Sequence, residues 1–175
     1  HIDLDSHLSL FDGLPTREKL NILTSSKGLP IELHDFINTL KQQYTINICY
    51  QHCKPKFNHK FVLARLKNLG FKVAVCSNSM RQTIDTMMKL SSLESFIDLT
   101  LSNEDVLNAK PDPEIYLKAI DYFKLKPEEC LILEDNEHGI KAAEASGGNL
   151  LKIKDPSDVT WYKINSTINQ FINQR

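Results

Sequence analysis

Apolar positions along the chain follow two different periods, and the change between them comes near residue 55. From about residue 14 to residue 50, apolar residues recur every three or four positions, for example Phe36, Ile37 and Leu40, as in amphipathic helices. After a break at CKPK (53–56), short and almost wholly apolar runs alternate with further helical patterns. Strands that are apolar on both faces are typical of parallel sheets covered by helices. The sequence therefore predicts a doubly wound, Rossmann-like α/β fold preceded by a helical subdomain.

Beyond the break, the predicted elements alternate regularly between helix and strand. The apolar runs predict buried strands at 71–79, 96–102, 130–135 and 149–154. The helical patterns predict helices at 57–70, 80–90, 113–124, 138–146 and 160–174. Two of these helices end at a glycine, Gly70 and Gly147, which is the commonest residue just past a helix end. We expect helical subdomain residues in 1–55, and an α/β core domain with a C-terminal helix in 56–175.

Composition and charge limit the classes of partner. The 175 residues are 41% hydrophobic and 25% charged, as in ordinary globular domains. A net charge of −1 argues against nucleic acid or an anionic membrane surface as the partner. No apolar run approaches the ~20 residues that span a bilayer. Cysteines within apolar runs fit a reducing compartment, so we expect a cytoplasmic protein, with the oligomeric state open and a monomer as the simpler expectation.

One group of residues has the spacing of a metal site. Cys49, His52 and Cys53 lie at helical i, i+3 and i+4 positions. No second ligand pair follows at the spacing of structural zinc sites. We therefore interpret these residues as a helix face packed on a neighbouring element.

Polar residues of a particular kind follow three of the predicted strands. Ser77 and Asn78 end the first strand, Lys110 lies in the loop after the second, and Glu134 and Asp135 end the third. Ser77 alone could cap the next helix, and Lys110 alone could be a solvated loop lysine. Ligands of open parallel sheets bind at the carboxyl ends of the strands, however, where these residues would meet. A hydroxyl with backbone amides can hold a phosphate, a lysine can neutralise it, and paired acids suit Mg²⁺.

Three segments that carry these residues resemble motifs of the haloacid dehalogenase superfamily. VAVCSNS (73–79) resembles its second motif, NAKPDPEIY (108–116) the third and LILEDNEHGIKAAEASG (131–147) the fourth. The resemblance is closest to the phosphatases and β-phosphoglucomutases with a small helical cap, and covers about residues 10–155. It implies that residues 1–55 are the remainder of the cap.

The resemblance implies phosphoryl transfer through an aspartyl-phosphate. Ser77, Asn78 and Lys110 would bind phosphate, with Ser77 and Lys110 in catalytic roles, and Glu134 and Asp135 would hold the cofactor Mg²⁺. GLPTREKL (13–20) resembles a cap segment whose arginine contacts a substrate phosphate in β-phosphoglucomutase-like members. Arg17 would be that residue, and Lys41 is a weaker candidate.

The family's first motif, an apolar strand followed by D-x-D-G-x-[VT], has no counterpart in the sequence. HIDLDSH (1–7) contains Asp3 and Asp5, but only two residues precede them and no glycine follows. Acids near a helix start explain them better, so we assign them no catalysis. In the family, the first-motif strand lies between the strands that carry Ser77 and Glu134. We expect the nucleophilic aspartate upstream of residue 1, within ~35–45 further residues, and expect the 175 residues alone to be inactive.

Three functions stay open at this point. The first is a Mg²⁺-dependent phosphatase acting on a small phosphorylated metabolite such as a sugar phosphate. The second is a phosphomutase of the β-phosphoglucomutase type, and the third is an inactive, truncated relative that binds phosphate or a partner. Haloalkanoate dehalogenation is disfavoured, because Glu134 and Asp135 suit a metal that this chemistry does not use.

Overall fold

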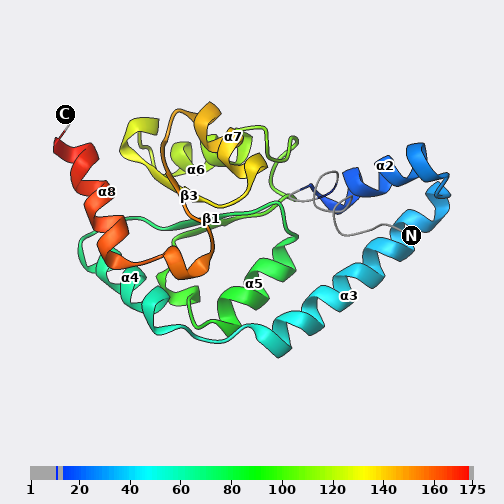
Figure 1. Ribbon diagram of the computed structural model, residues 1–175, viewed down its shortest axis with the longest axis horizontal. Helices are drawn as coiled ribbons and strands as arrows, with labels where there is room; N and C mark the ends of the chain where they lie inside the picture. The colour runs from blue at the N-terminus through cyan, green and yellow to red at the C-terminus, as the bar shows by residue number, and fades with distance from the viewer. Residues whose placement is uncertain (1–10, 12–13, 174–175) are drawn as a thin grey trace.

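The computed structural model describes residue 11 and residues 14–173, so Asp3 and Asp5 lie outside the described residues. Its first part is helical: α2 (Thr16–Lys27) and, after a short 3₁₀ turn, α3 (His34–His52). Between them, Gly28 adopts a left-handed conformation with φ of 70°, which ends α2 at the KGLP break. Figure 1 shows α2 and α3 extending to one side of the remaining elements.

The second part alternates strands and helices, as the sequence predicts. Its strands are β1 (Ala74–Cys76), β2 (Leu99–Leu101), β3 (Leu131–Glu134) and β4 (Asn149–Lys152). Its helices are α4 (Phe57–Asn68), α5 (Arg81–Leu90), α6 (Glu114–Tyr122), α7 (Glu137–Ser146) and α8 (Trp161–Asn173). In Figure 1, α6 and α7 lie on one side of the strands, and α4 and α5 lie on the other. The α/β fold class is therefore confirmed.

The strands pair in parallel as two separate pairs. β1 pairs with β2, Cys76 opposite Leu101, and β3 pairs with β4, Glu134 opposite Lys152. Within the described residues, no strand joins the two pairs. An apolar cavity of about 600 Å³ is lined by both β1 and β3 and by residues of α4, α6 and α8. We call it the inter-strand slot. It lies where the sequence analysis expects a strand to be missing.

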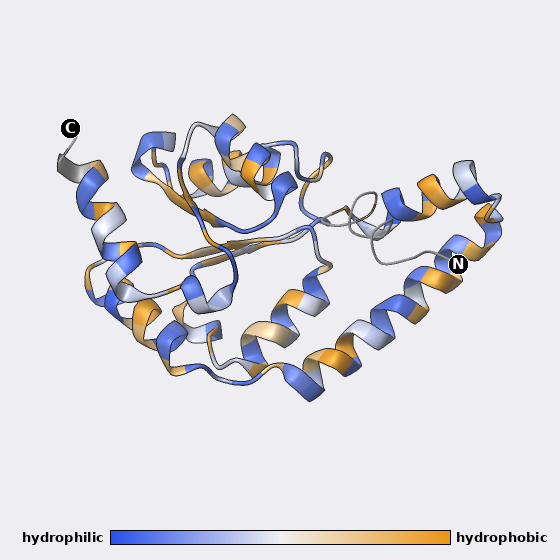
Figure 2. Cartoon of the chain, in the orientation of Figure 1, coloured by the Kyte–Doolittle hydropathy of each residue, from blue (hydrophilic) through white to orange (hydrophobic). Residues whose placement is uncertain are grey.

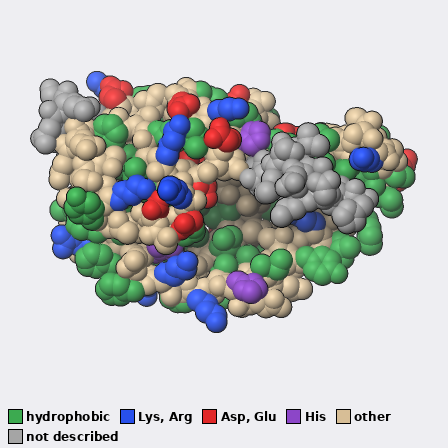
Figure 3. All heavy atoms as spheres, in the orientation of Figure 1, with side chains coloured by type: hydrophobic (Ala, Val, Ile, Leu, Met, Phe, Trp, Pro, Cys, Tyr) green, Lys and Arg blue, Asp and Glu red, His purple; other side chains and the backbone are tan. Residues whose placement is uncertain are grey.

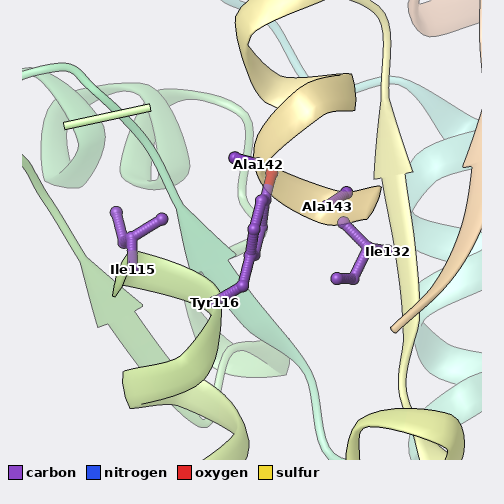
Figure 4. Packing of buried hydrophobic residues seen from close by; sticks show 5 residues of the cluster. All are labelled: Ile115, Tyr116, Ile132, Ala142 and Ala143. Atoms are coloured by element: carbon purple, nitrogen blue, oxygen red, sulfur yellow. The ribbon is translucent and has the colours of Figure 1, made fainter. Parts of the chain in front are cut away.

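The core is built where α6 packs on β1 and β2, α7 packs on β3, and the two helices pack on each other. Figure 4 shows Ile115 and Tyr116 on α6, Ile132 on β3, and Ala142 and Ala143 on α7, all buried in one cluster. The Tyr116 ring projects toward α7, with its hydroxyl end next to Ala142. Both alanines are fully buried, so a larger side chain at either position would have to displace its neighbours. The cluster thereby fixes the start of α6 relative to the end of β3.

The outer helices differ in how fully they are covered. On α8, Ile164 is buried, and the Trp161 ring lies 4.8 Å from the guanidinium of Arg65 on α4. On α3, by contrast, Phe36, Tyr44 and Ile48 are exposed, and Figure 2 shows apolar residues along this helix. No helix in the described part of the chain is long and apolar enough to cross a membrane.

The remaining sequence features can also be placed. Cys49 is buried and Cys53 is partly buried, and both are free thiols. Among the described residues, no three acidic, histidine or cysteine side chains are grouped to hold a metal. Acidic and basic side chains are interspersed on the face of the molecule seen in Figure 3.

Candidate functional site

The polar residues at the strand ends meet at one cavity. Lys110 bonds to the last residues of both β1 and β3, so the carboxyl ends of these two strands lie together. A cavity of about 420 Å³ lies there, and we call it the polar cavity. Its lining includes all five residues that the sequence analysis placed at the strand ends: Ser77, Asn78, Lys110, Glu134 and Asp135. Their grouping is observed, and their chemical roles stay predictions.

Lys110 connects the ends of the two strand pairs. Its ammonium group donates to the carbonyl oxygen of Cys76, the last residue of β1, at 2.9 Å. It also donates to Glu134 Oε1, at the end of β3, at 2.5 Å. Only 7% of Lys110 is exposed, so this is a buried ion pair and not a solvated loop lysine. An ammonium has three donors, and two are used here, so one remains for a ligand.

Tyr116 is a third partner in this group, and the sequence analysis missed it. Its hydroxyl donates to the same Glu134 Oε1, and its ring centroid lies 4.6 Å from the Lys110 ammonium. Burial, and then the negative charge of Glu134, raise the pKa of the Tyr116 hydroxyl, which therefore stays a donor. The sequence did contain a signal for this role. Tyr116 lies among the apolar positions of the helix predicted at 113–124, and the hydroxyl of a buried tyrosine needs a hydrogen-bond partner.

Asn78 holds the loop that carries Lys110. Its side-chain amide donates to the Lys110 carbonyl oxygen at 3.2 Å, and its Oδ1 accepts from the Lys110 N–H at 3.1 Å. These reciprocal bonds tie the end of β1 to a loop 32 residues later. The Asn78 side chain therefore positions Lys110.

Ser77 follows β1 directly and lines the polar cavity. Its backbone N–H donates to Leu101 O at 3.0 Å, and its Oγ accepts from the Ser79 N–H at 3.1 Å. Helix α5 begins at Arg81, and its N-cap residue is Met80. The alternative interpretation of Ser77 as the cap of this helix is therefore wrong.

The two acids differ in their surroundings. The Glu134 side chain is 11% exposed, whereas Asp135 is exposed and has no ion pair among the described residues. Mg²⁺ in proteins keeps several waters and takes one or two carboxylates together with substrate phosphate oxygens. Glu134 and Asp135 fit this donor set. Cys76 does not contribute a thiolate, because burial raises the pKa of its thiol to about 11.

Helices α2 and α3 supply the opposite wall of the polar cavity. The lining residues from this side include Thr16, Lys19, Lys41, Gln42 and Thr45. The Lys41 ammonium donates to Thr16 Oγ1 at 3.0 Å. Arg17 is exposed and is not among the lining residues. The sequence motif thus indicated Arg17 and, more weakly, Lys41, whereas Lys19 and Lys41 line the cavity.

Comparison with known proteins agrees with the motifs. A family described as haloacid dehalogenase-like hydrolase matches residues 4–153. Pyrophosphatase PpaX of Bacillus mycoides is 32% identical over 108 residues, which cover 54% of this chain and 50% of the relative. Pyrophosphatase PpaX of Bacillus cereus is 39% identical over 82 residues, which cover 47% of this chain and 38% of the relative. The chain thus spans half or less of the length of these relatives.

Solved structures extend the similarity over more of the fold. β-Phosphoglucomutase from Clostridium difficile has a TM-score of 0.81 at 19% identity, over 98% of this chain and 84% of that one. CbbY from Rhodobacter sphaeroides, solved with xylulose-(1,5)bisphosphate, has a TM-score of 0.77 at 18% identity, over 87% and 71%. At these identities the similarity shows the fold alone.

Proposed function

The chain belongs to the haloacid dehalogenase-like hydrolase family, and we propose that it carries most of the site of a magnesium-dependent phosphatase. The substrate would be a small phosphorylated metabolite, with sugar phosphates as the first class to test. The observation that carries the proposal is the position of Lys110. Its ammonium group joins the ends of β1 and β3 beside Ser77 and two carboxylates, in a cavity of ligand size.

In this proposal the phosphate group binds at the core wall of the polar cavity. The third donor of the Lys110 ammonium and the Ser77 hydroxyl would each bind a phosphoryl oxygen, and Asn78 lies beside them in the lining of the cavity. Transfer of a phosphoryl group depends mainly on positioning and charge neutralisation. The bonds from Asn78 and Tyr116 would keep Lys110 and Glu134 in place during that transfer.

Glu134 and Asp135 would hold the Mg²⁺ ion, which when bound neutralises charge on the phosphoryl oxygens. We assign the attack on phosphorus to an aspartate upstream of residue 1, which would form an aspartyl-phosphate that water then hydrolyses. No third carboxylate, histidine or cysteine joins Glu134 and Asp135 among the described residues, in keeping with a further acid from outside them. The end of the inter-strand slot, which Glu134 also lines, is where that acid would reach the site.

The test is phosphate release by the full-length protein from a panel of sugar phosphates, with and without Mg²⁺. Inorganic pyrophosphate belongs in the panel, because two relatives carry the name pyrophosphatase. We expect Mg²⁺-dependent turnover, and a loss of at least about a hundredfold in kcat/KM for Asp135→Asn. Asp135 is exposed, so this substitution leaves the fold intact.

Lys54→Met serves as the control, because Lys54 is exposed in the loop between α3 and α4 and lines neither cavity. It should retain wild-type activity. Absence of turnover across the panel, or full activity in Asp135→Asn, would contradict the proposed function.

A further inference from the structure

Charged residues are unevenly distributed along the sequence. Residues 36–84 include eight lysine and arginine residues and no acidic residue. Because the whole chain has a net charge of −1 and this segment carries +8, the rest of the chain carries −9. Two of the eight cations are neutralised by ion pairs, Lys67 with Asp98 and Arg81 with Asp105. The other cations of the segment gather around helix α4, which lies in its middle.

Helix α4 has an inner face and an outer face of different character. On the inner face, Val62 and Leu66 line the inter-strand slot. The outer face carries Phe57, Phe61 and Arg65, at i, i+4 and i+8. All three are exposed, Phe57 to 78% and Phe61 to 40%. None of them lines either cavity, so neither a strand in the slot nor a substrate in the polar cavity would cover this face.

Planar side chains form a continuous row on the outer face. The rings of Phe57 and Phe61 are stacked, with centroids 5.8 Å apart and planes at 17°. The Arg65 guanidinium lies 5.8 Å from the Phe61 ring centroid and 4.8 Å from that of Trp161, on α8. Tyr162, the next residue of α8, is 84% exposed. Helices α4 and α8 pack together at the end of the molecule opposite α2 (Figure 1). We call this set of side chains the aromatic row: Phe57, Phe61, Arg65 and Trp161.

Arg65 is positioned within the row and has no counter-charge. In the part of the chain that the structure describes, no carboxylate lies within ion-pair distance of Arg65 or of the neighbouring exposed Lys60. Cation–π contacts hold a guanidinium in place and leave N–H groups at its edge free to donate. A guanidinium held in this way can bind a carboxylate through two parallel hydrogen bonds.

The composition of this face favours a protein partner over a polyphosphate. Aromatic residues and arginine are enriched at the centres of protein interfaces, where they supply most of the binding energy. Charges more than about 8 Å apart are screened at physiological salt, so a short acidic segment would interact mainly with Lys60 and Arg65. A long nucleic acid or an anionic membrane would extend past these cations, over a chain whose remainder carries −9.

We propose that the aromatic row, together with Lys60, docks an acidic segment of a partner protein. One carboxylate of that segment pairs with Arg65, and an apolar side chain packs on the exposed rings of Phe57 and Phe61. The inference goes beyond the proposed function and is independent of it, because none of these residues lines the polar cavity.

The test is fluorescence anisotropy with the full-length protein and a short labelled peptide, in which aspartate and glutamate alternate with phenylalanine and leucine. We expect a Kd of about 10–100 µM. The Kd should rise by about three- to tenfold between low and high salt, because salt screens the charges. A peptide with the same acids, but with serine at the apolar positions, should bind at least about fivefold more weakly.

Variants locate the contact. Arg65→Lys keeps the positive charge but loses the planar pair of donors, and should weaken binding by about five- to tenfold. Phe57→Ser removes an exposed ring, and should weaken binding by about three- to tenfold. Lys141→Met is the control, because Lys141 is an exposed lysine of α7 without an ion pair among the described residues. It should bind the peptide as wild type does, and all three variants should keep wild-type turnover.

Absence of binding to the wild-type protein would overturn the inference, as would undiminished binding in the Arg65 and Phe57 variants. Equal binding of the serine-substituted peptide would also overturn it, because charge alone would then explain the contact. Oligodeoxythymidylate and vesicles containing phosphatidylserine complete the test. If either binds more tightly than the peptide, and loses binding in the same variants, the face belongs to a nucleic acid or a lipid surface and not to an acidic protein segment.

Discussion

Glu134 is the residue on which the candidate site depends most, because it bonds to two neighbouring side chains and is also a proposed metal ligand. One of its oxygens, Oε1, accepts from both the Lys110 ammonium and the Tyr116 hydroxyl. Removing Lys110 would leave this carboxylate buried without a counter-charge, at a cost of about 3–5 kcal/mol. The pair therefore holds the ends of β1 and β3 together before any ligand arrives.

Gly139 provides the space that this arrangement needs. A Cβ atom built at Gly139 would overlap the Glu134 carboxylate. We expect Gly139→Ala to displace that carboxylate from Lys110 and Tyr116, and to lower the free energy of unfolding by about 1–3 kcal/mol. Urea denaturation measures the change, and activity should fall with it.

A double-mutant cycle separates this collision from a general effect of alanine. In a Glu134→Ala background the carboxylate is gone, so Gly139→Ala should be neutral or stabilising by up to about 1 kcal/mol, since alanine favours helix. An equal loss of stability in both backgrounds would show that Gly139 is needed for another reason.

At the residue level, the sequence predicted which strand-end residues gather, but not how they bond. Ser77, Lys110 and Glu134 line one cavity because parallel strands deliver their carboxyl ends to the same edge. The hydrogen-bond partners of Asn78 and Tyr116 depend on how side chains from distant segments are oriented. The spacing of apolar residues along the sequence carries no information about these orientations.

Lys19 could have been found from the helical period. Thr16, Lys19 and Leu20 lie at i, i+3 and i+4 on α2, so they share the face whose Leu20 is buried. Arg17 is one position beyond Thr16, about 100° around the helix. The position of Lys19 on the same helix face as the buried Leu20 therefore favours Lys19 over Arg17 as the residue that lines the cavity.

Among the elements, helix α6 holds the loop that contains Lys110, through the side chain of Glu114. The Glu114 carboxylate, in its first turn, accepts from the backbone N–H groups of Leu107 and Asn108 at 2.8–3.1 Å. It also pairs with Lys118 one turn later at 2.8 Å. These bonds, the one with Lys118 first, lower the pKa of Glu114 from 4.5 to about 2.

The lowered pKa predicts a specific pH dependence. A carboxyl group whose pKa falls on folding adds stability above its unfolded pKa, and this is lost as pH drops through the folded value. Glu114 should therefore stabilise the fold above pH 4.5 and lose this contribution between pH 4.5 and about 2. In Glu114→Gln, urea midpoints should fall less steeply over that window than in wild type.

Glu137→Gln is the matched control, because Glu137 is exposed and also lies in the first turn of a helix, α7. It should keep the wild-type slope between pH 4.5 and about 2. If both variants lose the same slope, the effect comes from charge at helix starts and not from the loop.

At the element level, the order of helices and strands was predictable, whereas the length of the strands was not. The apolar run at 71–79 predicted a long strand, but β1 spans only Ala74–Cys76. Apolar sequence indicates burial, while a strand also requires a hydrogen-bonded neighbour at each residue. β1 is paired only with β2 among the described residues, so its ladder ends where β2 ends.

For the whole molecule, the inter-strand slot is the feature with the largest consequence. β1 and β3 each pair on one side only within the described residues, and an apolar cavity of about 600 Å³ is lined by both. Two-stranded pairs are weak by themselves, and unpaired ladder groups favour addition of a strand. Because Glu134 lines both cavities, a strand in the slot would end beside Lys110.

We therefore expect the 175-residue chain to bind an extended apolar peptide. The probe is a synthetic peptide of alternating valine and isoleucine, with lysine at its start and aspartate at its end. At about 100 times its Kd, it should raise the Tm by about 5–10 °C. Hydrogen exchange should slow at Val75 and Ile132, whose strands face the slot.

A peptide with the same side chains but N-methylated at alternate positions is the control, because it keeps the apolar surface and loses ladder donors. It should raise the Tm much less. Equal stabilisation by both peptides would mean that the slot binds apolar surface without forming a strand. Stabilisation by the unmodified peptide alone would mean that β1 and β3 act as two edges of one incomplete sheet. The position of Lys110 and Glu134 would then be set by the sheet as a whole, since these residues join the ends of those two strands.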